Sequence, residues 1–211
     1  SEPIGVLELL DRLPKARFIR GNADRYIVNP DLPPPSAIPP EKLDWLIDAT
    51  RSQYWTIGAL SQTRWLDWLA QLPLECRFQL TDGTRGLLVH SHPGSDDGEG
   101  FHPKQSDEEV EALFRNADEN LIFVGHTHIL QERKIEGKHI FNTGSIAKPV
   151  SADTRATYMI LSADDAGYDV TAYHVAYDTE AVIQQMHAIG FPDIAYMEPF
   201  YRGDYISEHL K

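Results

Sequence analysis

The sequence has a single cysteine, no long apolar run and few basic residues. One thiol, Cys76, excludes an intrachain disulfide and a zinc or iron–sulfur centre built from cysteines. No apolar segment approaches the roughly 20 residues that span a bilayer, and the first residues lack the pattern of a secretory signal. The 19 basic residues face 32 acidic ones, and the net charge of −13 argues against non-specific nucleic-acid binding. We therefore expect a cytoplasmic protein that binds neither membranes nor nucleic acid stably.

The residues that are present suit one globular domain. The chain has 211 residues, of which 42% are hydrophobic and 24% charged, enough to bury a core without disulfide support. Six of the 14 prolines fall in the segment 30–40, which we expect to be a stiff extended connector. We therefore predict a single domain over residues 1–211, with a proline-rich connector and helical insertion at 29–75.

Apolar periodicity predicts a mixed α/β order of elements. Helical spacing is found at 3–13, 41–50, about 61–71 and 178–188, with Trp45, Trp65 and Trp68 directed to a core. Strand-like runs are found at 16–19, 86–90, 120–126, 138–142, 156–162 and 169–177. Ser106 and Glu109 form a capping box that predicts a helix between the second and third of these strands. The order indicates a βαβ-like unit followed by antiparallel strands.

Side chains able to bind metals follow three of the predicted strands. They are Asn22 in RGNADRY, His90 and His92 in LLVHSHPGS, and His126 and His128 in FVGHTHI. Loops at strand ends are where α/β proteins build their sites. If the backbone is extended, two histidines in an H-x-H pattern project to the same side, so both imidazoles can face one point. Two H-x-H patterns and a G-N loop together favour a metal site over coincidence.

The donor types narrow the choice of metal. Imidazole nitrogen and amide oxygen without thiolate favour manganese, iron, nickel, zinc or magnesium. Carboxylates usually complete such sites, and the nearby Asp24, Asp96 and Asp97 show no compelling spacing. We expect Asp24 to orient a histidine or to pair with an arginine, and the acidic segment 95–100 to be a solvated turn.

The order of these motifs resembles a known family. GNAD at 21–24, VHSHPGS at 89–95, GHTH at 125–128 and NTGSIAKP at 142–149 are similar to motifs of the calcineurin-like metallophosphoesterases, particularly their small bacterial and archaeal phosphodiesterase branch. The resemblance covers nearly the whole chain. It implies a four-layer α-β-β-α sandwich, in which two metal ions at the strand ends activate a bridging hydroxide that attacks phosphorus in line.

The resemblance also assigns ligands. Asn22, His90 and His126 match the ligands of one metal ion, and His128 matches a ligand of the other. The family pattern opens with a D-x-H strand and a G-D loop that carry further ligands, and no such segment precedes GNAD here. We therefore expect the first strands of the sandwich, and part of the metal shell, to be missing from this sequence.

A second departure concerns the proton donor. Ala23 stands where many family members carry a histidine that resembles a general acid, and alanine has no proton to donate. His92, which follows Ser91, is the candidate to substitute for it if its loop turns inward.

These observations lead to two main hypotheses. The first is an enzyme, a dinuclear metallophosphoesterase that hydrolyses small phosphate esters. The alternative is a degenerate, metal-incomplete module that binds or regulates another protein. A small metal-binding oxidoreductase is disfavoured, because the 2-His-1-carboxylate spacing and a dinucleotide fingerprint are both absent. The aromatic segment 187–205 is compatible with a homo-oligomer or with a tail folded on its own domain.

Overall fold

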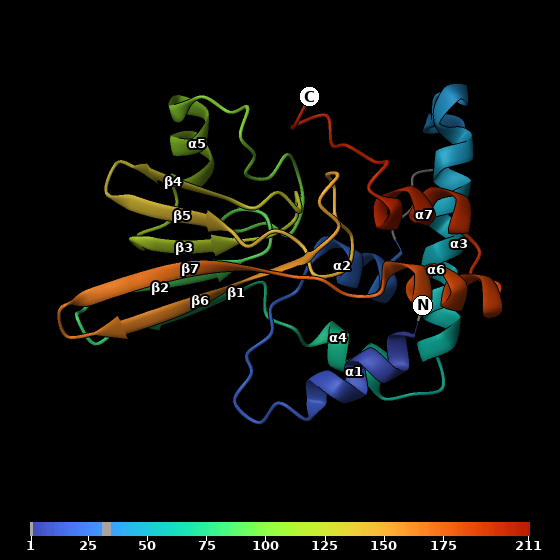
Figure 1. The fold of residues 1–211 in the computed structure, drawn as a ribbon, viewed down its shortest axis with the longest axis horizontal. Helices are drawn as coiled ribbons and strands as arrows, with labels where there is room; N and C mark the ends of the chain where they lie inside the picture. The colour runs from blue at the N-terminus through green and yellow to red at the C-terminus, as the bar shows by residue number, and fades with distance from the viewer. Residues whose placement is uncertain (1, 31–34) are drawn as a thin grey trace.

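A five-stranded sheet with the order β1-β2-β3-β5-β4 forms the centre of the protein (Figure 1). The computed structural model describes residues 2–30 and 35–211. The strands of this sheet are β1 (Glu75–Gln79), β2 (Arg85–Val89), β3 (Leu121–Val124), β4 (Gln131–Ile135) and β5 (Lys138–Asn142). Strands β2, β3 and β5 are parallel, whereas β1 and β4 pair antiparallel at the two edges. The predicted mixed α/β class is confirmed.

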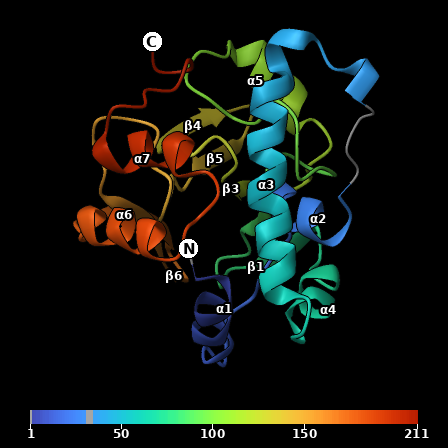
Figure 2. The ribbon, with the colours of Figure 1, turned by 90° about the vertical axis from the view of Figure 1, so that its right-hand side faces the viewer.

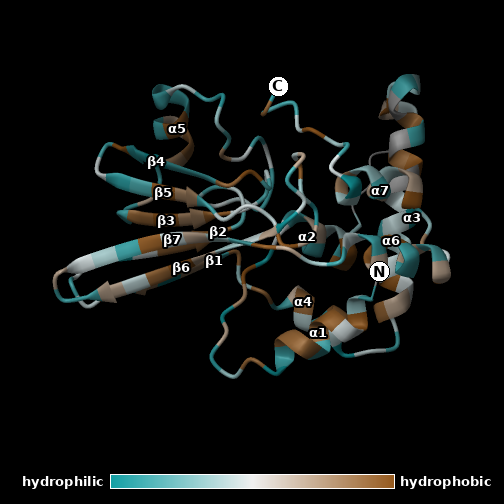
Figure 3. Ribbon diagram, in the orientation of Figure 1, coloured by the Kyte–Doolittle hydropathy of each residue, from teal (hydrophilic) through white to brown (hydrophobic). Residues whose placement is uncertain are grey.

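The two faces of this sheet bury alternate side chains of the same strands. Ile122 and Val124 lie in the core formed with α5 (Asp107–Phe114). Leu121 and Phe123 lie in a second core, against the hairpin of β6 (Ala156–Asp164) and β7 (Gly167–Val175). Figure 3 shows that β3 is hydrophobic along its length, while the turn of the hairpin is hydrophilic. Two sheets therefore pack face to face, as the resemblance implied.

The other helices gather near the end of the sheet where β2, β3 and β5 finish (Figure 1). They are α1 (Pro3–Asp11), α2 (Asn22–Val28), α3 (Leu43–Leu60), α4 (Trp65–Ala70), α6 (Thr179–Ala188) and α7 (Ile194–Arg202), with 3-10 turns at Pro35–Ala37 and Pro40–Lys42. Figure 2 shows α3 with α6 and α7 on one side and α2 and α4 on the other. The first four helices share a core that includes Leu7, Leu60 and Trp65. None of the helices in the described part of the chain is long and apolar enough to cross a membrane.

Most strong local signals are confirmed, including the capping box, in which Ser106 Oγ accepts a hydrogen bond from the Glu109 backbone N–H. The predicted strand at 16–19 is wrong. Its backbone is not part of a ladder, and the neighbouring Arg20 N–H bonds the carbonyl of Pro73 at 2.8 Å. Residues 31–34 of the predicted connector, and the side chain of Trp45, lie outside the described residues.

Helix α2 lies where a loop was predicted, and three further elements, β1, β4 and α7, were also not predicted. Strands β1 and β4 alternate charged or polar residues and carry no strong apolar run. Helix α7 contains Pro199, which normally argues against a helix interior. Each of the three forms because a neighbouring element pairs or packs with it, which the sequence window does not show.

Candidate metal centre

The carboxyl ends of β2 and β3 bring two of the predicted ligands together. The two strands are parallel neighbours, and the Gly125 N–H continues their ladder with a 2.9 Å hydrogen bond to the carbonyl of His90. Each strand then releases a histidine at the same edge of the sheet. The ring centroids of His90 and His126 are 5.3 Å apart and nearly perpendicular. His90 and His126 therefore lie side by side, as expected for loops at the ends of neighbouring strands.

The third predicted ligand comes from the amino end of α2. Gly21 is the N-cap of this helix, and Asn22 is its first residue. The Oδ1 atom of Asn22 lies 3.0 Å from Nε2 of His90. Asp24 Oδ2 accepts the Gly21 N–H at 2.8 Å, so this carboxylate caps the helix, a role different from those expected for it. Burial raises the pKa of Asp24.

The GHTH segment is not extended, contrary to the condition set by the sequence. His126 and His128 have φ angles of 63° and 62°, in the left-handed region, and Thr127 N–H bonds the Gly125 carbonyl at 2.7 Å. This backbone conformation is costly for residues with a Cβ and is typically found at functional sites. The two histidines therefore take different partners and do not simply share one face of a strand.

Backbone carbonyls orient both histidines of this segment. His126 Nε2–H donates to the Gly98 carbonyl at 2.8 Å. His128 Nδ1–H donates to the Lys148 carbonyl at 2.9 Å, which leaves its Nε2 as the atom with a free lone pair. A backbone acceptor on one ring nitrogen is the usual arrangement behind a metal-ligating histidine.

Two glycines leave the space that the imidazoles fill. A Cβ on Gly21 would lie 3.1 Å from Cε1 of His90. Gly100, with φ of 70°, would place a Cβ only 2.8 Å from Cδ2 of His126. Larger residues at either position would push an imidazole away from the centre.

A buried asparagine holds the GHTH loop. Asn142 is fully buried at the end of β5. Its Nδ2 donates to the Gly125 carbonyl at 2.6 Å and to Thr127 Oγ1 at 2.8 Å, and its Oδ1 accepts from Gly144 N–H at 3.0 Å. The sequence analysis quoted NTGS as part of a motif but gave Asn142 no role. The structure identifies it as a positioning residue for the histidine loop.

The acidic segment 95–100 is not a solvated turn. Asp96 is only 4% exposed and accepts hydrogen bonds from Arg20 at 2.7 Å and from Arg25 at 2.9 Å. Asp97 binds Arg25 and the hydroxyl of Tyr26. These contacts lower the pKa values of both aspartates against the opposing effect of their burial. They join the loop after β2 to helix α2, a long-range pairing that local sequence cannot reveal.

Burial lowers the pKa of two histidines at the centre. It is the main cause that lowers the pKa of His90 to about 4, and neighbouring His126 and His128 lower it further. Burial also lowers the pKa of His128. Neutral imidazoles have the lone pairs that divalent metals bind. The donor chemistry of Asn22, His90 and His126 therefore suits one divalent ion.

Carboxylate donors are scarce at this centre. In residues 2–30 and 35–211, no group of three or more histidine, cysteine, aspartate or glutamate side chains is arranged to hold a metal ion. The amide oxygen of Asn22 lies beside the imidazole of His90, 3.0 Å from its Nε2.

The other two predicted positions lie close by. Ala23 is exposed on α2, next to Asn22. His92 Nδ1–H donates to the Pro93 carbonyl at 3.3 Å, and its Nε2 would lie 3.6 Å from a Cβ on Gly98. Gly98 is also the residue whose carbonyl binds His126. His92 and His126 therefore both lie beside Gly98.

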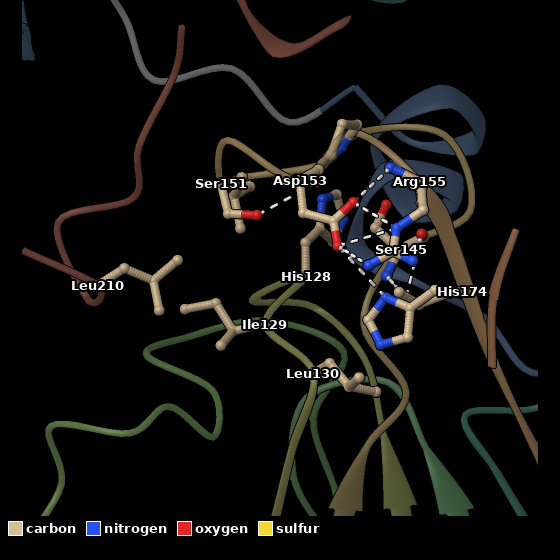
Figure 4. A pocket seen from close by; sticks show the side chains of 12 residues that line it. His128, Ile129, Leu130, Ser145, Ser151, Asp153, Arg155, His174 and Leu210 are labelled. Carbon is tan, nitrogen blue, oxygen red and sulfur yellow. Dashed lines mark hydrogen bonds and ion pairs between the residues drawn. The ribbon is translucent and has the colours of Figure 1, made fainter. Parts of the chain in front are cut away.

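Two hollows flank His128. One, drawn in Figure 4, has a volume of about 270 Å³ and contains the ion pair of Asp153 and Arg155. The other has a volume of about 340 Å³ and is lined by His126, His128, Lys148 and residues of α7 and the following tail. The segment 187–205 is accordingly folded on its own domain, where Phe200 and Tyr201 are buried.

Solved structures with the same fold cover almost the whole chain. A hypothetical protein from Pyrococcus horikoshii OT3 aligns with a TM-score of 0.76 at 19% identity, covering 96% of this chain and 80% of that one. A metallophosphoesterase from Sphaerobacter thermophilus aligns with a TM-score of 0.69 at 24% identity, covering 94% and 82% of the two chains. No curated protein matches the sequence significantly. The family model of the calcineurin-like phosphoesterase superfamily domain matches residues 2–166, and the chain therefore belongs to this superfamily.

Proposed function

We propose that this chain hydrolyses small phosphate esters at a centre of two divalent metal ions. One observation carries the proposal, namely the meeting of Asn22, His90 and His126 from three separate segments of the chain. Membership of a metal-dependent phosphoesterase family supports it. Asn22, His90 and His126 would hold one ion, and His128, through its free Nε2, would contribute to the other. Manganese, iron, nickel, zinc and magnesium all suit these donors.

The metal ions, when bound, would supply water activation and neutralise the charge of the phosphoryl group. The protein residues would do the rest. Asn142 fixes the loop that carries both histidines of GHTH, and the ion pairs of Asp96 hold helix α2 against the loop after β2. These contacts keep the donors in place without reorganisation when substrate binds.

We assign the leaving-group proton to His92 in its imidazolium form, in which Nε2 carries a proton in addition to the Nδ1–H that donates to Pro93. Its ring faces Gly98 at the edge of the centre, whereas Ala23 has no proton to give. A general acid contributes about 10²–10⁴ in rate, and most for a poor leaving group. His92→Ala should therefore slow an alkyl phosphodiester more than a p-nitrophenyl phosphodiester.

Metal content and hydrolysis test the whole proposal. Plasma mass spectrometry after dialysis should find about two transition-metal ions per chain, and a chromogenic phosphodiester should be cleaved only by metal-loaded protein. His126→Ala should weaken metal binding and hydrolysis by about 100-fold. His187→Ala is the control, because this side chain on α6 is 59% exposed and lies outside the candidate centre.

The outcomes separate the two hypotheses of the sequence analysis. Two ions with metal-dependent cleavage support the dinuclear phosphoesterase. One ion per chain together with cleavage contradicts only the dinuclear part of the proposal and leaves the phosphoesterase activity standing. One ion or none, without cleavage, contradicts the enzyme and favours the metal-incomplete binding module.

A further inference from the structure

The hollow of about 340 Å³ beside His126 and His128 has a wall that the proposed hydrolysis does not use. We call it the tyrosine pocket and define its outer wall by Lys148, Tyr196 and Tyr205, with Phe200 behind them. Its volume falls within the ~300–1000 Å³ of small-molecule sites. A group bound there would lie directly next to the candidate metal ligands.

Lys148 connects the candidate metal centre to this wall. Its backbone carbonyl accepts the hydrogen bond from His128 Nδ1–H at 2.9 Å. Its ammonium donates to the hydroxyl of Tyr196 at 3.1 Å and lies 4.4 Å from the centre of the Phe200 ring. An ammonium has three N–H donors, so two remain for a ligand.

Within residues 2–30 and 35–211, the ammonium of Lys148 has no ion-pair partner, although Glu99 lines the same hollow with its carboxylate 3.0 Å from Nε2 of His102. The lack of an ion pair is notable in a chain with a net charge of −13. An ammonium without an ion-pair partner attracts an anion, and a phosphate ester is one.

The tyrosines present flat apolar surface beside this cation. Tyr196 and Tyr205 are each 38% exposed, whereas Phe200 is 2% exposed. Tyr205 stacks on Phe200 with ring centroids 4.1 Å apart, and Tyr196 meets the same ring edge-on at 5.2 Å. Phe200 thus fixes both tyrosines, and their outer faces are left for a planar partner.

Each hollow has a carboxylate in its lining, but in the hollow on the other side of His128 the cation is already paired with it. Figure 4 shows the Asp153 carboxylate at the wall of that hollow, held by Arg155 and close to His174. The Arg155 guanidinium is the main cause that lowers the pKa of Asp153 to about 2, so this carboxylate is ionised. Its charge repels a phosphate, and the charge of Arg155 is already engaged.

We propose that the substrate is a phosphate ester that carries an aromatic ring, with a phosphoryl oxygen paired to Lys148 and the ring packed on Tyr196 and Tyr205. This inference rests on the proposed phosphoesterase function and names its substrate class. A nucleobase and a simple aryl group share this chemistry. Stacking of a base on an aromatic side chain contributes enough for about a tenfold preference over an ester without a ring.

Binding of two non-hydrolysable phosphonates tests the proposal. Calorimetric titration should show phenylphosphonate binding about tenfold more tightly than methylphosphonate. The preference should persist after the metal is removed, because the tyrosines supply it, although both affinities fall. Adenosine monophosphate against ribose 5-phosphate, titrated into metal-free protein, then distinguishes a nucleobase from a simple aryl group as the source of the ring.

Variants separate the two parts of the pocket. Tyr196→Ala should remove most of the preference for the phenyl group, whereas Tyr196→Phe should keep it. Lys148→Met should weaken both phosphonates alike. Tyr54→Ala and Lys134→Met are matched controls, since Tyr54 is 51% exposed on α3 and Lys134 is exposed on β4. Both controls should bind like the parent protein.

The failures of the two proposals are distinguishable. Equal affinities for phenylphosphonate and methylphosphonate, or a preference that survives Tyr196→Ala, overturn the aromatic-ester inference even if metal-dependent hydrolysis is found. A phenyl preference without any effect of metal on either affinity supports the pocket and counts against the phosphoesterase proposal.

Discussion

The same three strands, β2, β3 and β5, have very different surroundings at their middles and at their carboxyl ends. In the middle, Leu87, Ile122 and Ile140 are fully buried among apolar side chains. At the ends, His126 and His128 adopt left-handed backbone angles, and buried polar groups replace apolar ones. The middle of the sheet therefore stabilises the fold. The strand ends adopt backbone conformations that cost some stability, and these conformations hold the imidazoles at the candidate metal centre.

The largest loss of stability is expected when a side chain is truncated in the core at the middle of the sheet. Phe114 is fully buried beneath the sheet on α5, and Phe114→Ala should lower the free energy of unfolding by about 3–5 kcal/mol. Chemical denaturation measures this loss. Tyr54→Ala, at an exposed position, should change it by less than about 0.5 kcal/mol. A comparably small loss at Phe114 would contradict the assignment of stability to this core.

A smaller loss of stability is expected at the carboxyl ends of the strands when pH falls. The pKa of His90 in the folded protein is about 4, below its ordinary value of 6.5, so the unfolded chain takes up the proton first. Its stabilising contribution is present above pH 6.5 and is lost as pH falls towards 4, by up to about 3 kcal/mol. Denaturation of metal-free protein across this range measures it. His90→Asn should flatten the profile, and identical profiles for the two proteins would refute the prediction.

The smallest loss of stability is expected for Asn142→Ala, which should affect metal affinity more than folding. Asn142→Ala leaves the carbonyl of Gly125 and other buried groups without a partner, which costs about 1–3 kcal/mol. Metal affinity should nevertheless fall by about 10–100-fold, because the GHTH loop loses its anchor. Asn120→Ala removes a bond to Gly137 outside the site and serves as control. Equal metal affinities in these two variants would exclude a positioning role for Asn142.

Local sequence was a good guide where a signal and its structural cause lie close in the chain. The run that became β3 is apolar at every position, and Ser106 and Glu109 cap α5 with their own side chains. It failed at 16–19, because a strand exists only when another strand pairs with it. It also failed at Asp96, whose partners Arg20 and Arg25 are more than 70 residues away.

The sequence by itself determined the mixed α/β class, the position of His90 and His126 after strands β2 and β3 and, through its motifs, the superfamily. Periodicity and capping act within a few residues, so they can be read directly. Only the tertiary structure decided that GHTH adopts left-handed angles, that Asn142 anchors it and that Lys148 joins it to the tyrosines of the C-terminal segment. These features depend on contacts between distant segments, whose geometry is fixed only when the sheets and helices pack together.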